Sequence, residues 1–176
     1  VPETMLGKRT ARLNLRQEDD RQRFITLLSQ SDILIHGYRP DALTKLGFGE
    51  TNRQDIRPGI IEVTLDAYGW RGPWKGRRGF DSLVQMSSGI AEAGMRLLGR
   101  DRPTPLPVQA LDHATGYLMA SATLSAITHR QKNGRTMRAK LSLARTSHFL
   151  SQYDCAGDDD GELAPEGSSD RNPEIE

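Results

Sequence analysis

Apolar and polar residues alternate along the chain in blocks that predict strands and amphipathic helices in turn. Short apolar runs predict strands at residues 11–15, 32–36, 59–65 and 137–143. Apolar residues at helical spacing, such as Phe24, Leu27 and Leu28, predict helices, which we expect at residues 17–30, 40–46, 81–93, 113–130 and 144–152. Strands that alternate with helices in this rhythm are typical of an α/β domain with a largely parallel sheet.

A glycine-rich loop, GWRGPWKGRRG at residues 69–79, follows the third predicted strand. It places Arg71, Lys75, Arg77 and Arg78 among glycines, so its backbone N–H groups and cations are suited to phosphate. The loop matches neither the phosphate-binding GK[ST] pattern nor the dinucleotide fingerprint GxGxxG. A mobile basic surface loop explains the same residues equally well, and RNA binding has no RNP-like or KH-like pattern to support it.

The composition fits one globular domain: the 176 residues are 36% apolar and 27% charged, enough for a sizeable core. No run approaches the ~18 apolar residues that a membrane-spanning helix needs, and the first ten residues lack the apolar core of a secretory signal. The single cysteine, Cys155, excludes an internal disulfide and suits a cytoplasmic, reducing location. The four histidines lie far apart, so we expect no metal site.

Charge divides the chain into two parts. Residues 1–153 hold 23 Lys and Arg against 14 Asp and Glu, whereas residues 154–176 hold one Arg and nine acids. We expect a folded domain over 1–153 and an acidic, disordered tail over 154–176, because the tail has too few apolar residues to offset the entropy of ordering. The basic part suits a polyanion, either nucleic acid or a phosphate-rich cofactor, although solvated arginines explain its charge as well.

Asp112 stands just before the helix predicted at residues 113–130. One interpretation is an N-cap, in which its carboxylate accepts hydrogen bonds from free helical N–H groups. A carboxylate held ionised and aimed in this way is also suited to act as a nucleophile, so the two roles can coexist. We expect His113 to be an exposed first-turn residue rather than a base.

A third cluster, HGYR at residues 36–39, follows a strand predicted to be buried. It therefore falls at the carboxyl edge of the sheet, where open α/β sheets bind their ligands. An ordinary strand-to-helix turn explains these residues too.

Four segments in this order resemble family III CoA-transferases, the group related to formyl-CoA transferase and carnitine-type CoA-transferases. They are GKRTARLNL, SDILIHGYRPDALTKLGFG, RPGIIEVTLDAYGWRGPWKGRRGFDSLVQMSSGI and LDHATGYLMASATLSAITHRQKNGRTMRAKLSLARTSHFL. The resemblance spans about residues 6–152. It implies a Rossmann-like, largely parallel sheet with flanking helices, as an incomplete large domain of such an enzyme.

The resemblance also implies a chemistry. Asp112 corresponds to the catalytic carboxylate, which attacks an acyl-CoA thioester and carries the CoA to a carboxylic acid acceptor through covalent intermediates. Coenzyme A would enter as acyl-CoA, with no metal, no nucleic acid and no membrane, and the full-length protein would be an interlocked homodimer in the cytoplasm. The residues corresponding to the family's CoA contacts are Leu13, Asn14, Leu15, Arg16, Gly37, Tyr38, Arg39, Lys45, Arg78, Gly79, Phe80 and Asp81.

Several positions depart from the family pattern. Gly37 stands where the family often has Asn, and Lys45 stands where it often has Arg, so weaker phosphate contacts are expected. Leu111 replaces a common Gly before the catalytic Asp, and its bulk is expected to narrow the acyl site. The related α-methylacyl-CoA racemases have a His near the position that Phe80 occupies here. Because a phenylalanine side chain cannot transfer a proton, the resemblance disfavours racemisation.

Family members are more than twice as long, with an earlier segment, a later glycine-rich loop and a second domain. We therefore expect a fragment or truncated copy of a transferase. Two alternatives stay open: a racemase-like isomerase, and a catalytically inactive remnant that still binds CoA.

Overall fold

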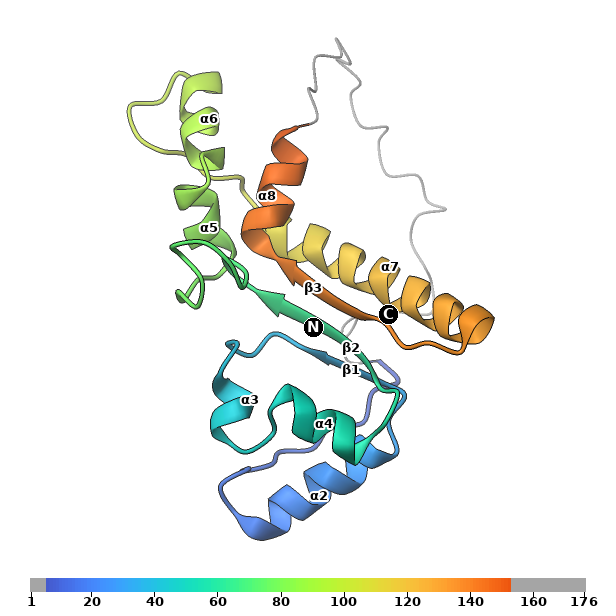
Figure 1. Ribbon diagram of the computed structural model, residues 1–176. Coiled ribbons are helices and arrows are strands. Elements are labelled where there is room, and N and C mark those ends of the chain that lie inside the picture. Colours follow the sequence, from blue (N-terminus) through green and yellow to red (C-terminus); the bar gives the residue numbers. More distant parts are fainter. Residues whose placement is uncertain (1–5, 153–176) are drawn as a thin grey trace.

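A three-stranded parallel sheet forms the centre of the computed structural model, which describes residues 6–152. Its strands are β1 (Ile33–His36), β2 (Ile61–Asp66) and β3 (Arg138–Ser142), in the order β1-β2-β3 (Figure 1). His36 pairs in register with Thr64, which pairs with Lys140, so these three side chains share one face. The expected α/β domain with a largely parallel sheet is confirmed.

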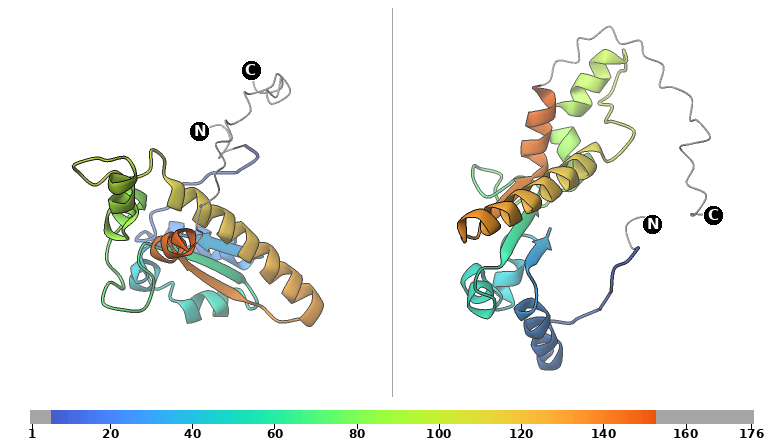
Figure 2. Two further views of the ribbon diagram at one scale, coloured as in Figure 1. Left: turned by 90° about the horizontal axis from the view of Figure 1, so that it is seen from above. Right: turned by 90° about the vertical axis from the view of Figure 1, so that its right-hand side faces the viewer.

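The helices lie on both sides of this sheet and at its carboxyl end (Figures 1 and 2). Helix α7 covers one face, and α3 and α4 cover the other, with α2 packed against α4. Helices α5 and α6 extend from the end of β2 beside α8. The bounds are α2 (Glu18–Ser29), α3 (Ala42–Lys45), α4 (Glu50–Ile56), α5 (Asp81–Ser87), α6 (Ile90–Leu97), α7 (Ala110–Asn133) and α8 (Leu143–Ser151).

Alternation along β2 gives the two faces of the sheet different chemistry. Ile61 and Val63 are fully buried against Met119 and Ala126 of α7, which forms the main apolar cluster. The residues between them, among them Glu62, point to the face under α3 and α4, where charged side chains gather. A second apolar cluster, made by Ala67, Val84, Leu111 and Leu143, joins α5, α7 and α8 at the carboxyl end of β2.

The strand predicted at residues 11–15 is wrong. The structure leaves 11–14 without regular structure and places Leu15 in a turn that leads into α2. A strand needs a neighbour for its backbone groups, and no described strand pairs with this segment. The sequence pattern of this segment favours an extended strand, but it does not determine whether a neighbouring strand is there to pair with it.

Three helical regions also differ from the sequence prediction. The helix predicted at 81–93 is two helices, α5 and α6, because Gly89 adopts a left-handed φ of 94° between them. Helix α4 was not predicted, since its sequence ETNRQDI is almost entirely polar. Helix α7 begins at Ala110, three residues before its predicted start, and its N-cap is Gln109.

Among the described residues, no helix combines the length and apolar character needed to cross a bilayer. The predicted acidic tail at 154–176 lies outside the described residues, so its disorder stays a prediction.

Candidate functional site

Segment 13–16 and helix α3 line a pocket of about 570 Å³, which we call the α3 pocket. Arg21 of α2 builds it, because its Nη1 donates to the backbone oxygen of Leu46 at 2.6 Å and to that of Leu15 at 3.3 Å. The same guanidinium lies 4.8 Å from the centroid of the Phe48 ring. The pocket is lined by Leu13, Asn14, Leu15, Arg16, Tyr38, Ala42, Leu43, Lys45 and Leu46.

Tyr38 and Lys45, two side chains of the α3 pocket, differ in how freely they can contact a ligand. Tyr38 is 63% exposed, and its ring stacks against His36 with centroids 6.0 Å apart. Lys45 forms an ion pair with Asp41, one helical turn earlier. A phosphate at Lys45 would therefore compete with an internal carboxylate.

A second pocket, of about 240 Å³, lies where β1 and β2 end against the glycine-rich loop; we call it the loop pocket. Its lining residues are Gly37, Arg39, Asp66, Ala67, Arg77, Arg78 and Gly79. The carboxylate of Asp66 accepts hydrogen bonds from the backbone N–H groups of Tyr68 at 2.9 Å and Gly69 at 2.7 Å. Asp66 thereby fixes the first turn of the loop.

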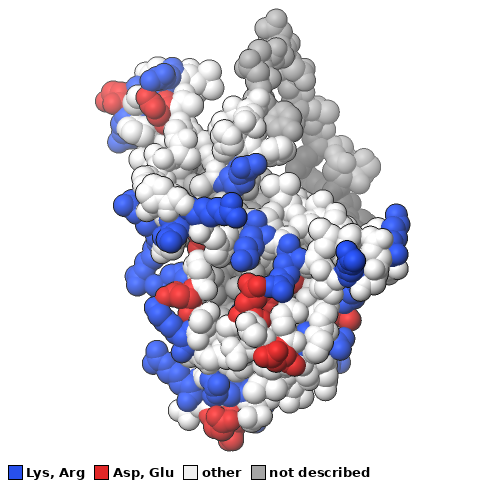
Figure 3. Space-filling model, viewed as in Figure 1, with Lys and Arg blue, Asp and Glu red and all other residues white. Residues whose placement is uncertain are grey.

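Three arginines of the loop pocket make no ion pair with any described residue: Arg39, Arg77 and Arg78. Lys and Arg side chains gather on the side of the molecule where the loop and α3 lie (Figure 3). Guanidinium groups that converge on one pocket without an ion-pair partner make a site for phosphate or carboxylate.

Asp112 lies in the first turn of α7, where its backbone N–H donates to Asp81 Oδ2 at 2.9 Å. Asp81 is 2% exposed, and its other oxygen accepts from Gln85 Nε2 at 2.5 Å. Gln85 in turn bonds the backbone of the connector before α7, at Leu106 and Val108. This buried network fixes the start of α7 and leaves the Asp112 side chain exposed.

Partial desolvation raises the pKa of the Asp112 carboxyl above its usual value, and the neighbouring Asp81 charge raises it further, while His113 lowers it. A raised pKa makes the ionised carboxylate more basic and hence a better nucleophile. His113 is exposed in the first turn of α7, as the sequence predicted.

The segment 78–81 connects the loop pocket to Asp112. Arg78 and Gly79 line the pocket, and Asp81, two residues later, holds the Asp112 backbone. Gly79 is required here, since a Cβ at this position would lie 2.6 Å from Ala67 Cβ and 2.9 Å from the Tyr68 ring. The segment therefore passes close against the end of β2 and links residues of the loop pocket to the residue that holds the Asp112 backbone.

The structure thus groups the residues expected to contact CoA. Six line the α3 pocket, four line the loop pocket, and two line neither: Phe80 is 65% exposed, and Asp81 is buried with both oxygens bonded inside the protein. Arg21 and Gln85 could not be found from the sequence pattern, because each bonds to backbone groups more than 20 residues away in the chain.

One interpretation from the sequence is wrong. Asp112 is not the N-cap of α7, since the helix begins two residues earlier and Asp112 sits within its first turn. The effect of Leu111 on an acyl site stays a prediction; its side chain is fully buried in the cluster with Ala67, Val84 and Leu143. Its burial anchors the start of α7.

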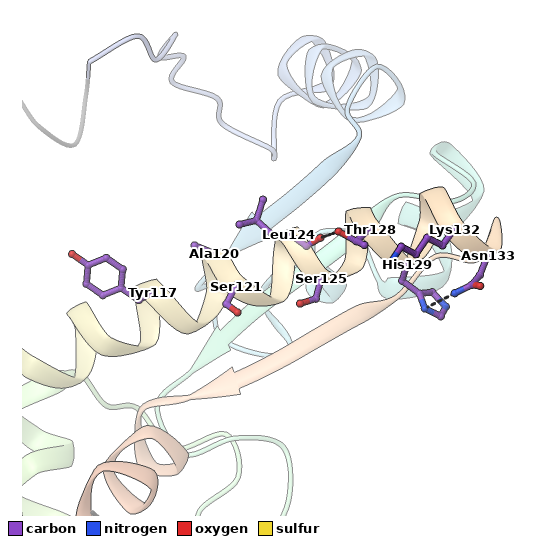
Figure 4. A pocket seen from close by; sticks show the side chains of 9 residues that line it. All are labelled: Tyr117, Ala120, Ser121, Leu124, Ser125, Thr128, His129, Lys132 and Asn133. Carbon is purple, nitrogen blue, oxygen red and sulfur yellow. Dashed lines mark hydrogen bonds between the residues drawn. The ribbon is translucent and has the colours of Figure 1, made fainter.

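A further groove, of about 670 Å³, runs along the outer face of α7 (Figure 4). All of its lining side chains come from that one helix, and Tyr117 and Leu124 are 78% and 66% exposed. None of the residues expected from the sequence to bind or react lines this groove. Within residues 6–152, no group of three or more metal-ligating side chains is placed to hold an ion.

A model of CoA-transferase family III matches residues 4–175. The chain belongs to this family. Among its relatives, a probable fatty acyl-CoA transferase of Mycobacterium tuberculosis, Rv3272, is 34% identical over 73% of this chain. The beta subunit of the succinyl-CoA–L-malate CoA-transferase of Chloroflexus aurantiacus is 32% identical over 73%, and the acetyl-CoA:oxalate CoA-transferase of Acetobacter aceti is 29% identical over 95%.

Solved structures agree with the fold of this family III chain. A crystal structure of Rv3272 matches 82% of it with a TM-score of 0.76 and 30% identity. A CaiB/BaiF family protein of Brucella suis matches 83% with a TM-score of 0.73. The chain spans only 32% of the length of the M. tuberculosis relative and 43% of the Acetobacter relative.

Proposed function

We propose that this chain binds acyl-CoA and carries the nucleophile of an enzyme that transfers CoA to a carboxylic acid acceptor. One observation carries the proposal: Asp112 is exposed in the first turn of α7, while the segment that holds its backbone also lines a pocket of unpaired arginines. A nucleophile and a site for phosphates are thereby joined by four consecutive residues.

The reaction proceeds by acyl transfer at Asp112. Its carboxylate attacks the thioester carbonyl and the C–S bond breaks, which gives a mixed anhydride and free CoA thiolate. The thiolate then attacks the Asp112 carbonyl and expels the donor carboxylate, which leaves an aspartyl-CoA thioester. The acceptor carboxylate displaces the thiolate to form a second anhydride, and the thiolate finally takes the acceptor acyl group and frees Asp112.

Three features of the chain support these steps. The raised pKa of Asp112 strengthens the nucleophile. The hydrogen bond from the Asp112 backbone to Asp81 fixes the position from which it attacks. The α3 pocket and the loop pocket share the side of the sheet at which β1 ends, so a phosphate-rich cofactor can occupy both.

A transferase is favoured over a racemase-like isomerase. An isomerase must move a proton at the α-carbon, and the exposed Phe80 beside Asp81 cannot do so. The relatives reported above are named as transferases.

The test is trapping of the covalent intermediate. The chain is mixed with an acyl-CoA, quenched with hydroxylamine and digested, and the peptide that contains Asp112 is examined by mass spectrometry. We expect a hydroxamate at Asp112 that is absent from Asp112→Asn and present in the matched control Asp101→Asn, which changes an exposed acid.

CoA binding is followed separately as the rise in melting temperature with CoA, since ligand binding to the native state alone raises stability. Asp112→Asn should keep this rise. A wild-type chain that CoA stabilises, but that forms no adduct, would instead favour the catalytically inactive remnant. A chain that CoA does not stabilise would contradict the proposed function.

A further inference from the structure

We propose that Arg77, held in place by Trp74, is a further CoA-binding residue that binds the diphosphate group together with Arg39 and Arg78. This inference rests on the proposed function. It adds a contact at a position to which the family resemblance assigns no role.

The side chain of Arg77 is held by aromatic packing. Its guanidinium carbon lies 4.8 Å from the centroid of the Trp74 ring, and the Arg77 backbone N–H donates to the Trp74 oxygen at 3.1 Å. The Trp74 ring meets the Tyr68 ring edge-on, with centroids 5.1 Å apart and an interplanar angle of 81°. The Tyr68 hydroxyl is hydrogen bonded to Ser87 of α5 at 2.9 Å. A chain of contacts thus runs from a helix to the tip of the loop.

The charge around the pocket is unbalanced. Arg39 reaches it from the end of β1, and Arg77 and Arg78 reach it from the loop, so two separate segments bring three cations together. The pocket's one acidic residue, Asp66, accepts two backbone N–H groups of the loop through its Oδ1. Three guanidinium groups at one pocket repel each other, and a diphosphate with its two negative charges would relieve that repulsion. Their forked N–H donors match the geometry of phosphate oxygens.

The loop itself selects which cations take part. It carries four, but only Arg77 and Arg78 line the pocket, whereas Arg71 and Lys75 do not. Gly72 and Gly76 both have left-handed φ values, 81° and 73°, and turn the chain between these positions. Arg71 and Lys75 therefore provide matched controls: the same loop, the same loss of one positive charge and the same exposed setting.

The experiment measures CoA affinity by calorimetry on the whole chain for Arg77→Ala, Arg71→Ala and Lys75→Ala. Loss of a charge-assisted contact to phosphate should weaken CoA binding by about tenfold in Arg77→Ala. The two control variants should change it by less than about twofold, because exposed charges outside the contact act only through a screened field. Equal losses in all three variants would overturn the inference.

Shortened ligands show which phosphate is bound. The loss in Arg77→Ala should be the same with 3′-dephospho-CoA, which keeps the diphosphate, and should vanish with pantetheine, which has no phosphate. A loss that disappears with 3′-dephospho-CoA would assign Arg77 to the 3′-phosphate and overturn the diphosphate site.

The role of Trp74 is tested by a double-mutant cycle with Arg77. Trp74→Leu should weaken CoA binding less than Arg77→Ala does, and it should add nothing to the Arg77→Ala loss, because it acts only through that side chain. Equal effects of Trp74→Leu in both backgrounds would contradict this. Melting without ligand checks that each variant is folded. If the wild-type chain does not bind CoA, the proposed function fails as a whole; if it does, and Arg77→Ala behaves like Arg71→Ala, only the present inference fails.

Discussion

Two regions of the molecule use arginine in opposite ways. On the sheet face under α4, Arg53 is 6% exposed and donates to both oxygens of Glu62, at 2.9 and 3.0 Å, and to the Phe48 backbone oxygen. In the loop pocket, by contrast, Arg39, Arg77 and Arg78 are exposed and make no ion pair with a described residue.

The difference separates charges that serve the fold from charges that are available to a ligand. A buried guanidinium must be paired, because desolvation without a partner costs several kcal/mol. An exposed guanidinium stays hydrated. It can therefore remain without an ionic partner, and available to bind an anion, at little cost to stability. We therefore predict two separate effects. Substitutions in the buried pair change the free energy of unfolding, and substitutions in the loop pocket change the affinity for CoA.

The largest effect is expected for Glu62→Gln. It removes the charge that compensates Arg53 in the interior, and breaking one partner of a buried ion pair costs about 3–5 kcal/mol. Urea denaturation measures the free energy of unfolding. The control is Glu92→Gln, which breaks the exposed pair with Arg96 on α6 and should cost at most about 0.5 kcal/mol. A loss in Glu62→Gln no larger than in the control would mean that the buried pair does not support the fold.

The second-largest loss of stability is expected for Gly79→Ala, because the added Cβ has no room. The new Cβ would meet Ala67 and Tyr68 inside van der Waals contact, so overpacking should cost about 1–3 kcal/mol and displace the segment that reaches Asp112. Gly116→Ala is the matched control, because nothing lies within 4 Å of its Cβ and the residue is inside a helix. That control should stabilise the chain by about 0.5–1 kcal/mol, so the two alanines should shift the unfolding midpoint in opposite directions.

A smaller effect is expected at His36, which lies on the same face as the buried pair. Both of its ring nitrogens are buried without a hydrogen-bond partner among the described residues, in a pocket of about 150 Å³ beside Arg53 and Lys140. Burial lowers the pKa of His36, and the positive charge of Arg53 lowers it further, while Glu62 opposes the shift.

The sign of the pH dependence follows. Above pH about 6.5 His36 is neutral in both states and contributes nothing. Below pH about 6.5 the unfolded chain protonates His36 more readily than the folded chain does. The free energy of unfolding therefore decreases as the pH is lowered. His36→Gln should remove that part of the decline, as measured by the free energy of unfolding at each pH. Identical profiles for wild type and His36→Gln would contradict the prediction.

The smallest effect on stability is expected for Arg39→Ala. Its side chain is exposed and unpaired among the described residues, so unfolding should change by no more than about 0.5 kcal/mol. CoA affinity should fall in the same variant. A stability loss above about 1 kcal/mol would show that Arg39 supports the fold, as the buried Arg53 is expected to do.

The local pattern of the sequence predicted most of the elements. Apolar runs and helical spacing place β1, β2, β3, α2, α7 and α8 within a few residues of where the structure has them. The sequence also placed Asp112 at the start of a long helix and the segment at 36–39 at the carboxyl edge of the sheet, because both follow from the order of elements. These properties depend on neighbours within one or two turns of the chain.

Contacts between distant residues decided the rest. Segment 11–15 has strand propensity, but no described strand pairs with it. Its last residue, Leu15, lies in a turn, and Arg21 donates both to the Leu15 oxygen and to that of Leu46, 25 residues away from the arginine. Leu111 is buried against Ala67, Val84 and Leu143, which are all distant from it in the chain. Likewise, the sequence shows four cations in one loop, and only the folded turns bring Arg77 and Arg78, without Arg71 and Lys75, to the pocket beside Arg39. Propensity is local, whereas pairing, burial and the convergence of charge depend on which distant segments the fold brings together.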